Sequence, residues 1–208
     1  MKVFIDTAVK GCNIALFNDV DVFAIAQEPI ERGHAETLLP LFQDHLKKSD
    51  HSPRDIQEIY VTVGPGSFTG LRVGLTVAEF MGFTLQKPIY GLTTFQAFSC
   101  GVDQECDRAV TIETKRSDYY YQILNSNHEA VSEAQSISAE LINIPENTLL
   151  TGDAVDRFVE EKNIDGLYIQ QDMINIEAVV KAIQAQSIDY QKVEAFYIRD
   201  ADVSQPKK

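Results

Sequence analysis

The chain has 208 residues, of which 44% are hydrophobic, and it carries a formal net charge of −13. This length suffices for one large or two modest domains, and the apolar share suffices for a packed core, which excludes a disordered chain. The excess of acidic residues disfavours direct binding to nucleic acid, because phosphate binding needs clusters of Lys and Arg. No apolar run reaches the length of a membrane span.

The cysteines indicate the compartment. Cys12, Cys100 and Cys106 are odd in number and show no CxxC spacing, so neither a disulfide framework nor a zinc site is expected. Met1 and Lys2 lead straight into strand-forming residues, without the pattern of a secretory signal. We therefore expect a cytoplasmic protein with free thiols.

The first part of the chain alternates strands and helices. Apolar and β-branched runs predict an antiparallel meander of three strands at residues 3–7, 12–18 and 20–28. Asp6 stands at the tip of the first strand, where it is either an acid that helps to hold phosphate and metal or an ordinary turn aspartate. Residues 33–48 show the apolar spacing of an amphipathic helix.

The central stretch organises the rest of the chain. Residues 59–63 predict a buried strand, Gly64-Pro65-Gly66 a tight turn, and residues 68–85 a long helix, which Ser67 or Thr69 can cap. The turn is not a P-loop, because no lysine follows it. It fits the spacing GxGxxxG, but the next strand carries no acid that could hold a ribose, which argues against a dinucleotide site.

The helix at residues 68–85 is apolar nearly all round, and Arg72 and Glu79 are its only charged residues. Small residues recur at every fourth position along one ridge, namely Gly70, Gly74, Ala78 and Gly82. Such a ridge indicates the close approach of another backbone, either this chain's own sheet or a partner's helix, and plain core packing is the alternative. A second apolar face on a helix packed against its own sheet predicts a subunit interface.

The polar segment at residues 101–107 marks an expected boundary between two lobes, residues 1–102 and residues 103–208. An open alternative is that the last residues of the second lobe return to the first. The first lobe closes with a strand at 88–92 and a helix at 94–100. The second lobe is expected to contain strands at 108–114, 119–125 and 148–151, a possible further strand at 129–135, helices at 138–142, 154–162 and 176–186, and an extended tail at 196–200. Asp153 is expected to cap the helix at 154–162.

Motifs for catalysis are sparse. Neither GxSxG nor HExxH occurs, and the acids form no pair with clearly different surroundings. Cys–His catalysis stays open, although neither Cys12 nor Cys106 stands at a helix start that would favour a thiolate. The residues alone therefore predict no active site.

The sequence GPGSFTGLRVG at residues 64–74, between a strand and an apolar helix, resembles the TsaB (YeaZ) family of the tRNA threonylcarbamoyladenosine pathway. Similar segments cover the chain nearly end to end, at residues 4–17, 33–42, 88–98, 109–124 and 195–203. The second lobe departs from the family pattern, since Glu113-Thr114-Lys115-Arg116 replaces its usual Asp-Ala-Arg.

The resemblance implies an α/β, two-lobed actin/Hsp70-like fold (ASKHA, ribonuclease H-like) with mixed sheets flanked by helices. It also implies a non-catalytic subunit without a cofactor. The metal-binding HxxxH of the related TsaD protein is replaced here by His34 and Leu38, so no metal site is expected. Asp6, Gly152 and Asp153 are the weak candidates for binding a nucleotide, because a fuller glycine-rich loop stands at this place in relatives.

The resemblance further implies partners. TsaD would transfer the threonylcarbamoyl group from its adenylate to the adenosine 3′ of the anticodon, and the ATPase TsaE would regulate the complex. The chain alone would form a homodimer, and tRNA would be touched only through the complex. The expected interface lies on the first two helices and comprises His34, Leu38, Leu39, Phe42, Phe68, Gly70, Leu71, Arg72, Gly74, Leu75, Ala78, Glu79 and Gly82. The alternatives are an ATP-binding enzyme of the same fold, a peptidase-like relative and a stand-alone homodimeric binding protein.

Overall fold

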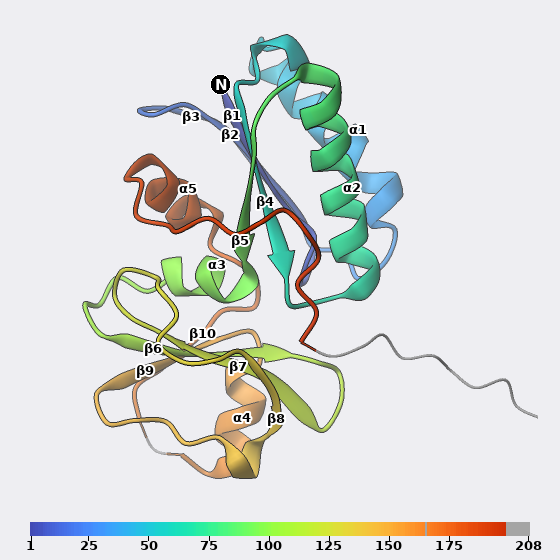
Figure 1. Cartoon of the computed structure of the whole chain (residues 1–208). Coiled ribbons are helices and arrows are strands. Elements are labelled where there is room, and N and C mark those ends of the chain that lie inside the picture. Colours follow the sequence, from blue (N-terminus) through green and yellow to red (C-terminus); the bar gives the residue numbers. More distant parts are fainter. Residues whose placement is uncertain (165, 199–208) are drawn as a thin grey trace, which may run out of the picture.

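The computed structural model describes residues 1–164 and 166–198, which form two mixed sheets and their covering helices (Figure 1). The first sheet has the strand order β3-β2-β1-β4-β5. Its strands are β1 (Lys2–Asp6), β2 (Cys12–Phe17), β3 (Val22–Glu28), β4 (Glu58–Gly64) and β5 (Ile89–Thr93). β1, β2 and β3 pair antiparallel, which confirms the predicted meander, and β4 and β5 add parallel strands.

The second sheet repeats this topology, with the order β10-β9-β6-β7-β8. Its strands are β6 (Asp107–Glu113), β7 (Asp118–Leu124), β8 (Gln135–Ser138), β9 (Thr148–Gly152) and β10 (Tyr168–Gln170). β6, β7 and β8 form an antiparallel meander, and β9 and β10 add parallel strands beside β6. β10 was missed by the sequence analysis because its three residues are too few to show a period.

Helices complete a layered arrangement (Figure 1). α1 (His34–Lys48) and α2 (Phe68–Leu85) cover the outer face of the first sheet, and α4 (Val155–Lys162) covers the outer face of the second. α3 (Thr94–Cys100) and α5 (Ile176–Gln184) lie between the two sheets. Short 3₁₀ turns occur at Pro53–Asp55 and Ala139–Leu141, and the second is found where a helix was expected.

The layer between the sheets is one continuous hydrophobic core. Phe4 and Phe17 from the first sheet, Phe95 and Phe98 from α3, and Ile112 from the second sheet all belong to it. α3 contacts strands of both sheets, and α5 contacts β2 of the first sheet although it follows the second sheet in sequence. The expected lobe boundary near residue 102 therefore stays a prediction, since the two halves share this core.

The inner side of α2 packs closely against the residue that follows β1 and against β5. A Cβ added at Gly70 would lie 2.0 Å from the carbonyl oxygen of Thr7, and one at Gly74 would lie 2.5 Å from the Thr7 hydroxyl oxygen. At Gly82 the added Cβ would lie 2.5 Å from the side chain of Ile89 in β5. Of the two open interpretations of the small-residue ridge, the structure selects the approach to this chain's own sheet. The Ser67 hydroxyl accepts a hydrogen bond from the Gly70 amide (3.2 Å), which confirms the predicted cap.

Residues 188–198, named here the C-terminal strap, return to the first sheet after α5 (Figure 1). Gln191 exchanges two backbone hydrogen bonds with Gly91 of the edge strand β5, and the Phe196 amide donates to the Val63 carbonyl (2.7 Å). The remainder of the family-like segment at 195–203, from residue 199 on, lies outside the described residues. Within the described part of the chain, no helix combines the length and apolar character needed to cross a membrane.

The glycine contact at the start of α2 is open to a direct test. Ala normally stabilises a helix by about 1 kcal/mol relative to Gly, but in Gly70→Ala the new Cβ overlaps the Thr7 carbonyl oxygen. We expect a net destabilisation of about 1–3 kcal/mol in urea-induced unfolding. Thr76→Ala, at an exposed position of the same helix, serves as the control and should change the free energy of unfolding by less than about 0.5 kcal/mol. A Gly70→Ala protein as stable as the wild type would contradict the packing described.

Candidate functional site

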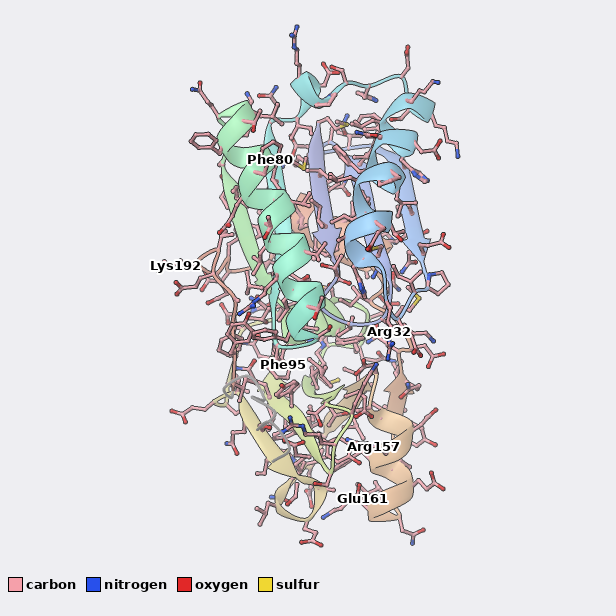
Figure 2. The ribbon with its side chains drawn as sticks, turned by 90° about the vertical axis from the view of Figure 1, so that its right-hand side faces the viewer. Arg32, Phe80, Phe95, Arg157, Glu161 and Lys192 are labelled. Atoms are coloured by element: carbon pink, nitrogen blue, oxygen red, sulfur yellow. The ribbon has the colours of Figure 1, made fainter. Side chains whose placement is uncertain are left out.

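The outer side of α2 exposes large apolar residues to solvent. Phe80 is 67% exposed and Phe83 is 87% exposed, and Leu39 of the neighbouring helix α1 is 42% exposed. Arg72 and Glu79, the only charged residues of α2, are exposed on the same side. Figure 2 views this side, with α1 and α2 next to each other and Phe80 labelled. We name these five residues the outer face.

The structure divides the predicted interface residues into a buried and an exposed set. Nine of the thirteen residues are buried within the chain itself, namely His34, Leu38, Phe42, Gly70, Leu71, Gly74, Leu75, Ala78 and Gly82. They are buried because the inner ridges of α1 and α2 pack onto the first sheet. Leu39, Phe68, Arg72 and Glu79 remain on the surface.

Phe80 was not among the predicted interface residues, although it is one of the most exposed. Its spacing from Arg72 and Glu79 along the helix could have identified it as exposed. Positions 72, 76, 79, 80 and 83 share one side of an α-helix, so the two charged residues already mark the side that faces water. The residues of the opposite ridge then have to face the sheet.

A small aromatic cluster lies where α2 begins. The rings of Phe68 and Tyr197 have centroids 5.2 Å apart, and the Arg72 guanidinium carbon lies 3.7 Å from the centroid of the Phe68 ring. The Arg72 Nε donates a long hydrogen bond of 3.4 Å to the Tyr197 hydroxyl. The end of the C-terminal strap is therefore joined to the start of α2.

A cleft of about 470 Å³ opens beside this cluster, between the two sheets. Its walls come from the β1–β2 turn, the start of α1, the start of α2 and the β6–β7 turn, with the C-terminal strap at one edge. Its charged lining residues are Lys10, Glu31, Glu113, Lys115, Arg116, Asp153 and Asp172. The buried side chain of His34 also lines the cleft, and its Nε2 has no hydrogen-bond partner among the described residues.

The Asp6 carboxylate is fully buried and lies outside the set of residues that line the cleft. It accepts hydrogen bonds from the Ala8 amide (3.0 Å), the Asn13 side chain (2.8 Å) and the Thr62 hydroxyl (2.7 Å). Burial raises the pKa of this carboxyl, and the three hydrogen bonds act in the opposite direction. Asp6 thus joins β1, β2 and β4, which is the structural role of a turn aspartate.

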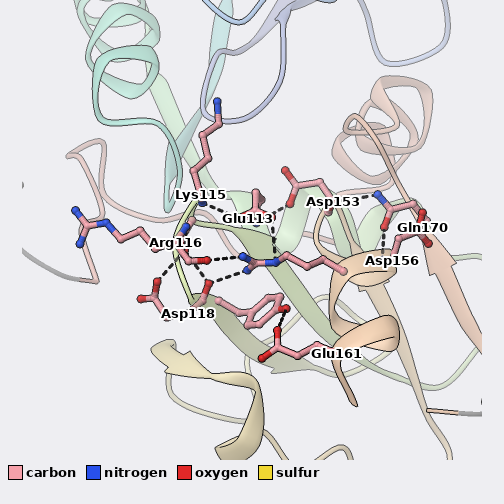
Figure 3. A network of polar contacts seen from close by, with 11 residues as sticks. Glu113, Lys115, Arg116, Asp118, Asp153, Asp156, Glu161 and Gln170 are labelled. Carbon is pink, nitrogen blue, oxygen red and sulfur yellow. Dashed lines mark hydrogen bonds and ion pairs between the residues drawn. The ribbon is translucent and has the colours of Figure 1, made fainter. Parts of the chain in front are cut away.

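A polar network holds the β6–β7 turn from below (Figure 3). The Arg157 guanidinium lies over the Tyr119 ring at 3.9 Å, forms an ion pair with Glu113 (3.2 Å) and donates to the carbonyl oxygens of Arg116 and Asp118. With the turn fixed in this way, the side chain of Lys115 points away from the network toward the first sheet.

β9 ends at Gly152, and Asp153 follows it next to the end of β6. The sequence predicted that Asp153 caps α4, and this prediction is wrong. The Asp153 Oδ1 instead accepts a hydrogen bond from the Glu113 amide (2.8 Å). Burial raises the pKa of Asp153 to about 7, and the neighbouring Glu113 carboxylate adds to the rise. A Cβ at Gly152 would lie 2.0 Å from the Thr111 carbonyl oxygen, so close strand packing accounts for this glycine.

Candidate metal ligands and two of the three cysteines can be placed in the structure. Among residues 1–164 and 166–198, no group of three His, Cys, Asp or Glu side chains is placed to hold a metal ion. Burial raises the pKa of the Cys12 thiol to about 11 and that of Cys100 to about 12, so both stay protonated near neutral pH.

Comparison with known proteins assigns the chain to a family. The model of the family described as "TsaD: tRNA N6-adenosine threonylcarbamoyltransferase" matches residues 25–195. Relatives named "tRNA threonylcarbamoyladenosine biosynthesis protein TsaB" include one from Escherichia coli (38% identical over 97 residues, 47% of this chain and 42% of that protein) and one from Buchnera aphidicola (29% identical over 207 residues, 92% of each). The chain belongs to the TsaB (YeaZ) family.

Solved structures agree with this assignment at the level of the fold. A Pseudomonas aeruginosa protein described as similar to peptidase YEAZ matches with a TM-score of 0.81 at 19% identity, over 95% of this chain and 99% of that one. A Bacteroides thetaiotaomicron protein described as having an actin-like ATPase fold matches with a TM-score of 0.50 at 12% identity, over 88% and 95%. The TsaB-family chain therefore has the expected actin-like fold. It matches less than half the length of the Escherichia coli relative.

The raised pKa of Asp153 predicts a specific pH dependence of stability. Between its ordinary pKa of 3.8 and about 7, the folded chain holds a proton that the unfolded chain has lost, so the stability due to Asp153 decreases as the pH rises through this range. From pH 5 to pH 8 we expect the wild type to lose about 2–3 kcal/mol relative to Asp153→Asn, at about 1.4 kcal/mol per pKa unit. Urea unfolding at both pH values measures this difference. The control is Asp172→Asn, since Asp172 is a solvent-exposed acid of the same cleft, and this variant should keep the pH dependence of the wild type. If Asp153→Asn also kept that pH dependence, the raised pKa would not belong to Asp153.

Proposed function

We propose that this chain is a non-catalytic subunit in the formation of threonylcarbamoyladenosine on tRNA, and that it pairs with a TsaD homologue. Relatives that align with it carry the name of this biosynthesis, which supports the pathway. The outer face supports the role as a docking subunit. Phe80 and Phe83 project from a helix whose inner side is already fully packed, and this single observation carries the proposal.

We assign the chemistry to the partner. Two acids near the cleft, Asp6 and Glu113, are engaged in holding the fold, through Thr62 and Arg157 respectively. The TsaD homologue would carry out the transfer of the threonylcarbamoyl group from its adenylate to the adenosine 3′ of the anticodon, and a TsaE homologue would regulate the complex. A net charge of −13 disfavours direct tRNA binding, so tRNA would be held by other subunits. The free cysteines favour a reducing, cytoplasmic location.

The same outer face is suited to pairing with a second copy when the chain is alone. Two α2 helices packed antiparallel, with a two-fold axis between positions 75 and 76, bring Arg72 of each copy opposite Glu79 of the other. Apolar side chains then flank two ion pairs, and the surface is complementary to itself.

ATP binding is the second candidate, because the cleft is large enough for a small ligand and Lys10 and Lys115 reach it. Calorimetry with Mg-ATP distinguishes the two functions. Tight binding at one site that is abolished by Asp6→Asn would favour an enzyme, and it is not expected, since Asp6 is enclosed among three hydrogen-bond donors.

Reconstitution of tRNA modification with and without this chain tests the proposed function. With a purified TsaD homologue and the other components, we expect tRNA modification to require this chain. The Phe83→Asp variant should fail to restore modification. Because burying one Phe contributes about 1.5–3 kcal/mol, pairing measured by calorimetry should weaken at least about ten-fold. Leu141→Asp is the matched control, since Leu141 is 71% exposed but lies in the second sheet's half of the molecule. Full modification without the chain would disprove the role.

Charge reversal tests the self-pairing arrangement. Arg72→Glu and Glu79→Arg each place like charges opposite one another in the antiparallel pair, so each should shift sedimentation equilibrium toward monomer. The double variant restores opposite charges and should recover the dimer. Exposed ion pairs contribute about 0.2–1 kcal/mol each, so the expected shift is a few-fold in the dissociation constant. A double variant that dimerises no better than the single ones would reject this arrangement of the helices.

A further inference from the structure

The cluster at the start of α2 has the composition of a binding surface. Phe68 is 36% exposed and Tyr197 is 40% exposed, so both rings keep a free side although they contact each other. The Arg72 guanidinium stacks on Phe68 and bonds the Tyr197 hydroxyl through Nε. Tyr and Arg are the residue types in which the binding energy of protein interfaces is concentrated.

The position of Tyr197 is set by the C-terminal strap and not by α2. One residue earlier, the Phe196 amide donates to the Val63 carbonyl of β4, and Phe196 packs into the core on both sides of the first sheet. Tyr197 is therefore fixed relative to the sheet before it reaches Arg72. An arginine side chain has many rotamers, and ordering it in advance removes an entropic cost from binding.

The charge of Arg72 is not neutralised within the described chain. No carboxylate among residues 1–164 and 166–198 forms an ion pair with it. A guanidinium carries five N–H donors in a flat fork, and stacking on Phe68 leaves the edges of that fork accessible. Carboxylates and phosphates both fit such a fork, and in a protein partner the group of this kind is the carboxylate of Asp or Glu.

We propose that Tyr197 is a positioning residue of the docking surface: the end of the C-terminal strap holds the Arg72 guanidinium on Phe68 so that it receives a carboxylate of the docked TsaD homologue. The proposal rests on the proposed function, and it extends the docking surface from the outer face to the start of α2 and the strap. Arg72 belongs to both surfaces, which makes them continuous. The surface thus includes a residue more than one hundred positions away from α2 in sequence.

Binding of the full-length chain to a purified TsaD homologue, measured by calorimetry at several salt concentrations, tests this. Tyr197→Ala should weaken binding about ten-fold, as expected for a residue of this type at an interface. Tyr197→Phe keeps the ring and loses only the hydroxyl acceptor, so its effect should be about two- to three-fold. Tyr168→Ala is the matched control, because Tyr168 is similarly exposed but lies on β10 of the second sheet.

The coupling to Arg72 separates positioning from plain packing. In an Arg72→Met background, which keeps an unbranched stem without the charge, Tyr197→Ala should add less than about a two-fold effect. Both single variants should also flatten the salt dependence of binding, since Arg72→Met removes the ion pair and Tyr197→Ala leaves Arg72 unpositioned for it. Independent, additive effects of Tyr197→Ala and Arg72→Met, or an unchanged salt dependence, would overturn the proposal.

The outcomes distinguish the two proposals. If Phe83→Asp abolishes binding while Tyr197→Ala and Tyr197→Phe leave it unchanged, the docking function stands and the role of Tyr197 is refuted. If Phe83→Asp has no effect either, the docking function itself fails. Should Tyr197→Ala lower the melting temperature, Tyr197→Phe and the salt dependence decide the matter.

Discussion

The arrangement of this molecule depends on the close approach of α2 to the first sheet. The Thr7 carbonyl oxygen occupies the space that a Cβ of Gly70 would need, and the Thr7 hydroxyl donates a hydrogen bond to the Gly70 carbonyl (2.7 Å). Helix and sheet therefore meet through backbone atoms, which only glycine permits. Small residues occupy the line of closest approach, and Leu75 and Met81 fill the rest of the inner side. Phe80 and Phe83, in contrast, lie on the outer side and are exposed.

The repeated topology places an acid at the same position in each of the two sheets. Asp6 ends β1 in the first sheet, and Glu113 ends β6, its counterpart in the second. In each case hydrogen bonds or ion pairs tie the acid to neighbouring strands and turns: Asp6 to Asn13 and Thr62, and Glu113 to Arg157. The acids at equivalent places thus stabilise strand ends.

Much of the fold could be predicted from local sequence, whereas the orientation of α2 could not. The meander, the helix at residues 68–85 and its Ser67 cap each follow from short-range patterns. The ridge of small residues, by contrast, has the same spacing whether it meets a sheet of the same chain or a helix of another. In a helix that is apolar all round, hydrophobicity does not distinguish the two sides, and only Arg72 and Glu79 mark the side that faces water.

Other features needed contacts that are distant in sequence. Asp153 has the residue type of a helix cap, but its carboxylate is taken by the amide of Glu113, which lies 40 positions earlier. Nothing local to Tyr197 indicates that it meets Phe68 and Arg72, because the strap that carries it follows α5, more than one hundred positions after α2. Such pairings follow from topology, which single residues and short motifs do not encode.

The position of α2 also links the outer face to the cleft. Gly66, Ser67 and Phe68 line the cleft at one end of this helix, and Arg72, on its first turns, contacts the strap that closes the same edge. The inner side of α2 packs closely on Thr7 and on Ile89 of β5, so the helix stands directly between the first sheet and the outer face. Phe68, Arg72 and Tyr197 are then the side chains that connect the outer face with the edge of the cleft.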